Sequence, residues 1–287
     1  MCKSKLFPKG TNKLGALFGK KKIIIGVIHA LPTLGSPHYK GDSPEEIYHF
    51  AVSEAKAYAD GGVDGIIVEN GWDIPFSKPD DISIETVATM AVMTDRVCQA
   101  VDIPVGVNIL ANGVMQSLAT AKVSQASFVR SNQWANAYVA NEGLIEGAAA
   151  KALRYRTKIK AEEVMIMADV HVKHGSHSIV ADRSVPEQTR DVEWFAADVL
   201  IATGNRTGHP TPLAEVETIK NATTLPVVVG SGLNIDNVAE LLSVADGAIV
   251  ASSLKKDGVW WKPVELEQVK KLMDKVYKIR EKIREFD

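Results

Sequence analysis

The stretch VMIMADVHVKHG (residues 164–175) begins as an apolar run and ends with an Asp, two His and a Lys. Burying an ion away from water is costly, and a buried ion normally has a charged partner or a metal. The apolar half therefore predicts a buried strand, and the polar half predicts that this strand ends in a functional cavity.

Eight apolar runs of strand length occur along the chain. They are continuous rather than alternating, and segments with helical periodicity separate them. This pattern is typical of strands that are buried on both faces of a parallel sheet. The runs are 23–29, 65–70, 104–110, 126–131, 164–172, 198–204, 226–232 and 246–253.

The segments between these runs carry helix signals. In SPEEIYHFAVSEAKAYADGG, Ser43 is the expected N-cap, Pro44 the first helical residue, Glu46 the partner in a capping box, and Gly61 the stop. Further helices are expected within 112–123, 211–222, 234–244 and 263–283. Eight strand-then-helix units predict a single (β/α)8 TIM barrel of parallel strands over residues 23–287, preceded by a basic arm at 1–22.

A doubly wound open sheet is the alternative fold. The count of eight units speaks against it, as does the absence of a G-x-G-x-x-G motif at the start of any helix.

Composition limits the classes of partner. The chain has 33 Lys and Arg against 35 Asp and Glu, so no global field favours nucleic acid or an anionic membrane. Cys2 and Cys98 are the only cysteines, which argues against a disulfide framework. The first 22 residues contain seven Lys and no signal-length apolar run, and no transmembrane stretch is found in the sequence. We therefore expect a cytoplasmic protein with a solvated N-terminal arm.

Polar residues end several of the apolar runs, where a TIM barrel places its reacting groups. Because strand side chains alternate, Asp169, His171 and Lys173 are expected on one face, and Val170, Val172 and His174 on the other. The catalytic candidates are Glu69, Arg130, Asp169, His171 and Lys173, and the substrate-binding candidates are His29, Asn108, Asn132 and Thr203.

Structural roles remain open for some of these residues. His29 could be a hydrogen-bonded core histidine, and Asn108 and Thr203 could satisfy loop carbonyls. Arg130 could pair with Glu69 or Asp169 without a chemical role.

Small residues end the last two runs, in VVVGSGLNIDNV (227–238) and DGAIVASSLKKDG (246–258). Backbone N–H groups can approach an anion at such positions, and this is where TIM barrels usually bind phosphate. The phosphate-binding candidates are Gly230, Ser231, Gly232, Ser252 and Ser253.

The cofactor is left open by the sequence. Glu69, Asp169 and His171 form an oxygen and nitrogen set that could hold Mg²⁺, Mn²⁺ or Zn²⁺, but no compact metal motif is present. Without a metal, Asp169 and Lys173 could act as an acid–base pair, or Lys173 could form a Schiff base with a carbonyl substrate.

The sequence also resembles the BtpA family, written BtpA/SgcQ. The resemblance spans roughly residues 23–275 and rests on several segments: IGVIHALPTLGSPHYKG (25–41), GGVDGIIVEN (61–70), DIPF (73–76), PVGVNIL (104–110), GLIEGAAAKALRYR (143–156), ADVHVKH (168–174), VVVGSGLNIDNV (227–238) and ADGAIVASSLKKDG (245–258). It implies a barrel similar to ribulose-phosphate-binding enzymes. One branch of the family is associated with photosystem I accumulation in cyanobacteria, and another is encoded beside sugar uptake and metabolism genes.

Two functions follow as hypotheses. The first is an enzyme that acts on a small phosphorylated sugar or nucleoside-type metabolite by isomerase, lyase or glycosidic-cleavage chemistry. The second is a non-catalytic assembly or biogenesis factor, with a photosystem I-type role, that retains a phosphate-binding pocket. We also expect a homo-oligomer, to whose contact the tryptophans of GVWWKP (258–263) could contribute.

Overall fold

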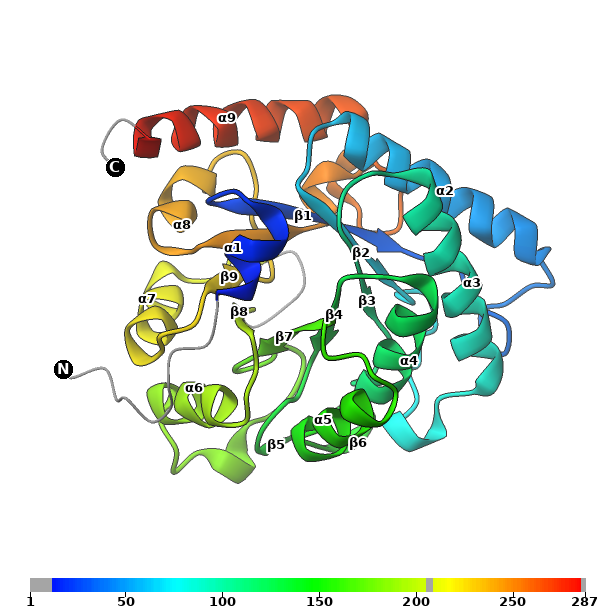
Figure 1. Ribbon diagram of the computed structural model, residues 1–287, viewed down its shortest axis with the longest axis horizontal. Coiled ribbons are helices and arrows are strands. Elements are labelled where there is room, and N and C mark those ends of the chain that lie inside the picture. Colours follow the sequence, from blue (N-terminus) through cyan, green and yellow to red (C-terminus); the bar gives the residue numbers. More distant parts are fainter. Residues whose placement is uncertain (1–11, 205–208, 285–287) are drawn as a thin grey trace.

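The computed structural model describes residues 12–204 and 209–284. Eight parallel strands form a closed barrel in the order β1-β10-β9-β8-β7-β4-β3-β2, with helices packed around it (Figure 1). Each expected strand run contributes one barrel strand, so the TIM-barrel prediction is confirmed. The strands are β1 (Ile23–His29), β2 (Gly65–Glu69), β3 (Val105–Asn108), β4 (Phe128–Ser131), β7 (Met165–Asp169), β8 (Val199–Ala202), β9 (Val227–Val229) and β10 (Gly247–Val250).

The helices follow the strands along the chain, as the sequence predicts. In the first long helix, the Ser43 side chain accepts from the Glu46 N–H while the Glu46 side chain accepts from the Ser43 N–H, which is the expected capping box. The helices are α1 (Lys13–Phe18), α2 (Pro44–Asp60), α3 (Ile84–Ala100), α4 (Val114–Ser124), α5 (Ala149–Lys158), α6 (Val185–Trp194), α7 (Leu213–Ala222), α8 (Val238–Val244) and α9 (Leu266–Arg284).

Two separate hydrophobic clusters hold the barrel together. The outer cluster lies between the strands and the helices, and Ile24, Ile66 and Ile166 represent it. The inner cluster fills the barrel and includes Ile25 and Ile67. Successive strand residues thus alternate between the two clusters, so the face on which any strand residue lies can be read from its register.

Helix α1 closes the N-terminal end of the barrel. Its buried side chains, Leu14 and Phe18, belong to the inner cluster, and the Phe18 and Phe128 rings lie 6.1 Å apart. Lys13 forms an ion pair with Asp198 at 3.0 Å, which fixes the start of the helix to the segment before β8. The structure therefore differs from the expectation of a solvated arm over residues 13–18, because two apolar side chains of that segment are buried. The part of the arm at 1–11 lies outside the described residues.

A β-hairpin is added between β4 and α5. Its strands, β5 (Ala137–Ala140) and β6 (Gly143–Glu146), are antiparallel and pair only with each other in the strand ladders. Gly143, at the turn, has a φ of +97°, a conformation that glycine adopts without strain. This hairpin is not among the elements expected from the sequence.

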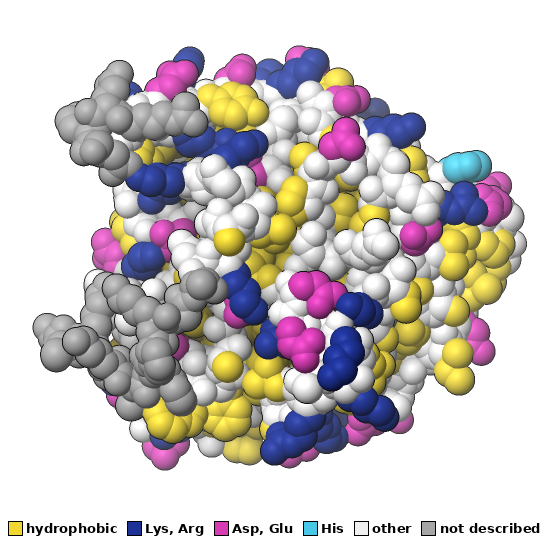
Figure 2. Space-filling model, in the orientation of Figure 1, with side chains coloured by type: hydrophobic (Ala, Val, Ile, Leu, Met, Phe, Trp, Pro, Cys, Tyr) yellow, Lys and Arg dark blue, Asp and Glu magenta, His cyan; other side chains and the backbone are white. Residues whose placement is uncertain are grey.

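Charge is mixed over the surface. Basic and acidic side chains are interspersed on the face seen in Figure 2, among patches of apolar side chains, as the nearly balanced composition implies. Over the described residues, no helix is both long enough and apolar enough to cross a membrane.

Candidate active site

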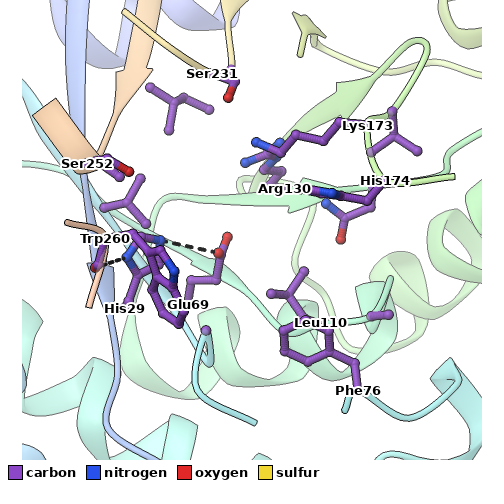
Figure 3. A pocket seen from close by; sticks show the side chains of 18 of the residues that line it. His29, Glu69, Phe76, Leu110, Arg130, Lys173, His174, Ser231, Ser252 and Trp260 are labelled. Atoms are coloured by element: carbon purple, nitrogen blue, oxygen red, sulfur yellow. Dashed lines mark hydrogen bonds and ion pairs between the residues drawn. The ribbon is translucent and has the colours of Figure 1, made fainter. Parts of the chain in front are cut away.

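A cavity of about 500 Å³ opens at the carboxyl ends of the barrel strands (Figure 3). Ionisable side chains, small residues of the β9 and β10 ends, and an apolar wall that includes Phe76 and Leu110 line it. Ten candidates from the sequence analysis line this cavity: His29, Glu69, Arg130, Asn132, Lys173, Gly230, Ser231, Gly232, Ser252 and Ser253.

Strand register explains why polar side chains meet at this level. Ile25 and Ile67 are inner-cluster residues, so His29 and Glu69, an even number of positions further along β1 and β2, also point into the barrel. His29 is the pairing partner of Glu69, which in turn pairs with Asn108. Three neighbouring strands therefore present His29, Glu69 and Asn108 side by side.

Arg130 and Asp169 form a buried, bidentate ion pair. Arg130 Nε donates to Asp169 Oδ1 at 3.0 Å, and its Nη2 donates to Oδ2 at 2.9 Å. Burial opposes the charged form of Arg130, but the Asp169 carboxylate beside it raises the guanidinium pKa. Arg130 lines the cavity and Asp169 lies behind it, so Asp169 holds the guanidinium in place rather than facing the cavity itself.

His29, Glu69 and Asn108 form a connected group on the adjoining strands β1, β2 and β3. The Nδ1 of His29 lies 2.9 Å from the carbonyl oxygen of Trp260, and its Nε2 lies 3.7 Å from Oε1 of Glu69. Asn108 donates its Nδ2 to Oε2 of Glu69 at 2.6 Å. Burial lowers the pKa of His29 to about 4, so the imidazole is neutral at pH 7. Asn108 does not line the cavity and acts on Glu69.

Lys173 extends into the cavity from the loop after β7 (Figure 3). Burial, followed by the nearby Arg130 cation, lowers the pKa of Lys173 to about 8, although Asp169 and Glu69 oppose that change. Across residues 12–204 and 209–284, its ammonium group has no hydrogen-bond or ion-pair partner. The backbone N–H of Lys173 donates to Thr203 Oγ1 at 3.1 Å, so Thr203 positions the loop and does not line the cavity.

The expected alternation fails beyond Asp169. Strand β7 ends at that residue, and His174 adopts a positive φ of 68°, so the chain turns before the alternation can continue. His174 lines the cavity, whereas His171 stacks on His177 with ring centroids 3.8 Å apart, outside the cavity lining. The expectation that His171 shares the inner face and that His174 leaves it is therefore wrong.

The rim at β9 and β10 consists of Gly230, Ser231, Gly232, Ser252 and Ser253. A Cβ at Gly230 would lie 2.4 Å from an Ile201 methyl group, and a Cβ at Gly232 would lie 2.1 Å from the His209 carbonyl oxygen. Both glycines are thus required by packing alone. The Ser253 hydroxyl donates to the Leu233 carbonyl at 2.7 Å and joins the two halves of the rim. Ser231 and Ser252 also line the cavity at this rim.

The proposed metal ligands are not grouped. Asp169 is engaged by Arg130, and His171 lies in the ring stack away from Glu69. Within the part of the chain that the structure describes, no three His, Cys, Asp or Glu side chains come together in a way that could hold a metal ion. Glu69, Asp169 and His171, which the sequence left open as metal ligands, are therefore not brought together.

Two loop residues that line the cavity are not among the candidates named from the sequence. Trp260, which follows β10, lines the cavity and meets the His29 ring edge-on, with centroids 5.2 Å apart. Tyr138, from the β5–β6 hairpin, also lines it. The sequence suggests that both tryptophans of GVWWKP could contribute to a contact between copies; Trp261 is 51% exposed, whereas Trp260 lines the cavity. Its place in the same segment after β10 as Ser252 and Ser253 is the signal that could have identified it.

Comparisons with known proteins agree with this architecture. Solved structures show the same fold: tryptophan synthase from Mycobacterium tuberculosis has a TM-score of 0.59 at 17% identity, covering 93% of this chain and 98% of that one. Thiamine phosphate pyrophosphorylase from Pyrococcus furiosus has a TM-score of 0.54 at 16% identity, covering 92% of this chain and 98% of that one.

Sequence comparison gives the family. The photosystem I biogenesis protein BtpA of Synechocystis is 40% identical over 236 residues, which are 82% of this chain and 81% of that protein. The model of the BtpA family matches residues 20–278, nearly the whole of the barrel and its helices. The resemblance noted in the sequence is thus confirmed, and the chain belongs to the BtpA family.

Proposed function

We propose that the protein is an enzyme that acts on a small phosphorylated sugar or nucleoside-type metabolite bound in the cavity. The phosphate would contact the β9–β10 rim at Ser231 and Ser252, and the rest of the molecule would extend toward Glu69, Arg130 and Lys173. The observation that carries the proposal is an amine in the cavity, Lys173, that has no ion-pair partner among the described residues and lies across the cavity from the small-residue rim.

Proton transfer is the chemistry that this arrangement supports best. With a pKa of about 8, Lys173 is partly neutral at physiological pH and can accept a proton from a carbon next to a carbonyl group. Arg130, held by Asp169, would stabilise the negative charge that develops on the carbonyl oxygen. Returning that proton to the former carbonyl carbon, while the O–H proton of the adjacent hydroxyl passes to the former carbonyl oxygen, would complete an isomerisation. This assigns Lys173 as the base and Arg130 as the electrostatic stabiliser.

Solvent exchange measured by NMR tests this assignment. Ribose 5-phosphate, ribulose 5-phosphate and hexose phosphates are incubated with the protein in D₂O, and deuterium incorporation next to the carbonyl is followed. We expect incorporation into at least one substrate, at a rate that rises with pH through about 8 as Lys173 loses its proton, and none with Lys173→Met. No exchange with any of them would contradict the enzyme proposal, and no binding of inorganic phosphate would contradict the phosphate site as well.

The rim is tested by calorimetry with inorganic phosphate. Ser252→Asp places a carboxylate beside the proposed phosphate and should weaken binding about ten-fold or more. Ser252→Ala is the matched control: it loses one hydroxyl hydrogen bond, so we expect a loss of about three- to ten-fold. If Ser252→Asp binds phosphate as tightly as the unchanged protein, the phosphate does not lie at this rim.

The second candidate is a non-catalytic biogenesis factor, which the name of the Synechocystis relative favours. Such a protein would use the cavity for ligand binding alone. The two candidates differ in the D₂O experiment, because a binding factor would show phosphate affinity without deuterium exchange.

A further inference from the structure

The hydrogen positions of His29 follow from its partners. Its Nδ1 lies 2.9 Å from the Trp260 carbonyl oxygen, and a carbonyl oxygen can only accept a hydrogen bond. Nδ1 must therefore carry a proton. Because burial keeps the pKa of His29 near 4, the ring has no second proton at neutral pH, and Nε2 has a bare lone pair.

The bare nitrogen faces a second acceptor. Oε1 of Glu69 lies 3.7 Å from Nε2, and the other carboxylate oxygen already accepts from Asn108 at 2.6 Å. Both His29 and Glu69 line the cavity (Figure 3). Two hydrogen-bond acceptors thus lie side by side at the cavity wall with no protein hydrogen between them. Such a pair is satisfied by a ligand that brings two donors.

We propose that His29 Nε2 and Glu69 Oε1 together bind a vicinal diol of the ligand, one hydroxyl donating to each atom. Adjacent hydroxyls supply two hydrogens from neighbouring oxygens, which matches two acceptors 3.7 Å apart. A ligand ammonium group would also supply hydrogens, but it would share the cavity with the cations of Arg130 and Lys173. The inference rests on the proposed function and narrows its substrate class to phosphorylated sugars, or nucleotides, with an intact vicinal diol.

The test compares ligands that differ by one hydroxyl. Ribose 5-phosphate has a 2,3-diol, and 2-deoxyribose 5-phosphate lacks it while keeping the phosphate. By calorimetry, we expect the deoxy compound to bind at least about ten-fold more weakly, because it leaves an acceptor unpaired. Equal affinities, or no binding of either sugar phosphate while inorganic phosphate binds, would overturn the diol inference and leave the phosphate site standing. If inorganic phosphate does not bind either, both proposals fail.

A variant locates the discrimination at this pair. In Glu69→Gln, the new amide can donate to His29 Nε2 itself, so the acceptor pair is lost while the shape is kept. We expect the preference for ribose 5-phosphate to fall below about three-fold. Ser252→Ala, in the β9–β10 rim, is the control: it weakens phosphate binding of both sugars alike and should keep the preference. A preference that survives Glu69→Gln would place the diol elsewhere in the cavity.

The protonation state of His29 gives an independent measurement. In ¹⁵N NMR of the full chain at pH 7, we expect Nδ1 to be protonated and Nε2 to have the shift of an unprotonated imidazole nitrogen. A protonated Nε2 would remove one of the two acceptors and would overturn the inference whatever the calorimetry shows.

Discussion

One buried ion pair lies inside the barrel and another lies outside it, and the two pairs differ in what surrounds them. Arg130 and Asp169 meet inside the barrel, where Arg130 lines the cavity. Lys255, 1% exposed, donates to Glu54 of α2 at 2.6 Å, outside the barrel and away from the cavity lining. Both pairs are equally hidden from solvent. Burial of charge alone therefore does not identify a functional group, whereas the adjoining cavity does.

The outer pair has a structural explanation. Glu54 accepts both from Lys255 and from the backbone N–H of Val264, at 2.7 Å, so it ties the segment after β10 to α2. Each carboxylate oxygen has a partner within the protein. In the inner pair, by contrast, the guanidinium of Arg130 donates to Asp169 while Arg130 also lines the cavity. The inner pair can act on a ligand, and the outer pair cannot reach one.

The largest expected effect comes from breaking the outer pair. Glu54→Gln keeps an acceptor for the Val264 N–H but leaves the Lys255 ammonium buried without a counter-charge. We expect the free energy of unfolding, measured with urea, to fall by about 3–5 kcal/mol. Phosphate affinity of the folded protein should be unchanged. A loss below about 1 kcal/mol would show that Lys255 simply gives up its proton at little cost.

Breaking the inner pair should lower the free energy of unfolding by less. Asp169→Asn removes the counter-charge of Arg130, but water in the cavity can solvate the guanidinium. We expect the same urea measurement to give a loss of about 1–3 kcal/mol, accompanied by loss of deuterium exchange because Arg130 is no longer held. A loss as large as that of Glu54→Gln, with exchange intact, would make Arg130–Asp169 a structural pair like the outer one.

The smallest effect concerns Lys173, the cavity cation that has no ion-pair partner among residues 12–204 and 209–284. The pKa of Lys173 is lowered from 10.5 to about 8, so between these values the unfolded chain binds more protons and stability rises with pH. Below pH 8 the full cost of the charged amine is present. We expect the unchanged protein to gain on the order of 1 kcal/mol between pH 7.5 and 9.5 relative to Lys173→Met. Identical pH profiles would show that Lys173 is well solvated.

The sequence predicts the barrel because each strand is a continuous apolar run that only a doubly buried parallel strand explains. It places His29, Glu69 and Arg130 at the cavity because alternation along a short strand needs no tertiary information. Alternation fails for His171 and His174, which lie in a loop after Asp169 whose turns depend on contacts such as the hydrogen bond between Thr203 and Lys173.

Loop-borne cavity residues are the other part that the sequence does not reveal. Trp260 reaches the cavity from an irregular segment, and Tyr138 reaches it from a hairpin. Neither segment has a side-chain periodicity from which its inward-facing residues could be predicted. The hairpin strands have four residues each, so the alternation that would mark them is brief. The turn at Asn141, Glu142 and Gly143 is the local signal that could have revealed the hairpin.

The docking of α1 has a consequence for the order of folding events. Leu14 and Phe18 are buried among residues that come from strands all round the barrel, so their binding surface is complete only when the circumference has closed. We therefore expect the helix to join last, with its contacts absent from the transition state for folding. Contacts of that kind slow unfolding without speeding folding, so we expect Leu14→Ala to raise the unfolding rate of the barrel and to leave its folding rate unchanged.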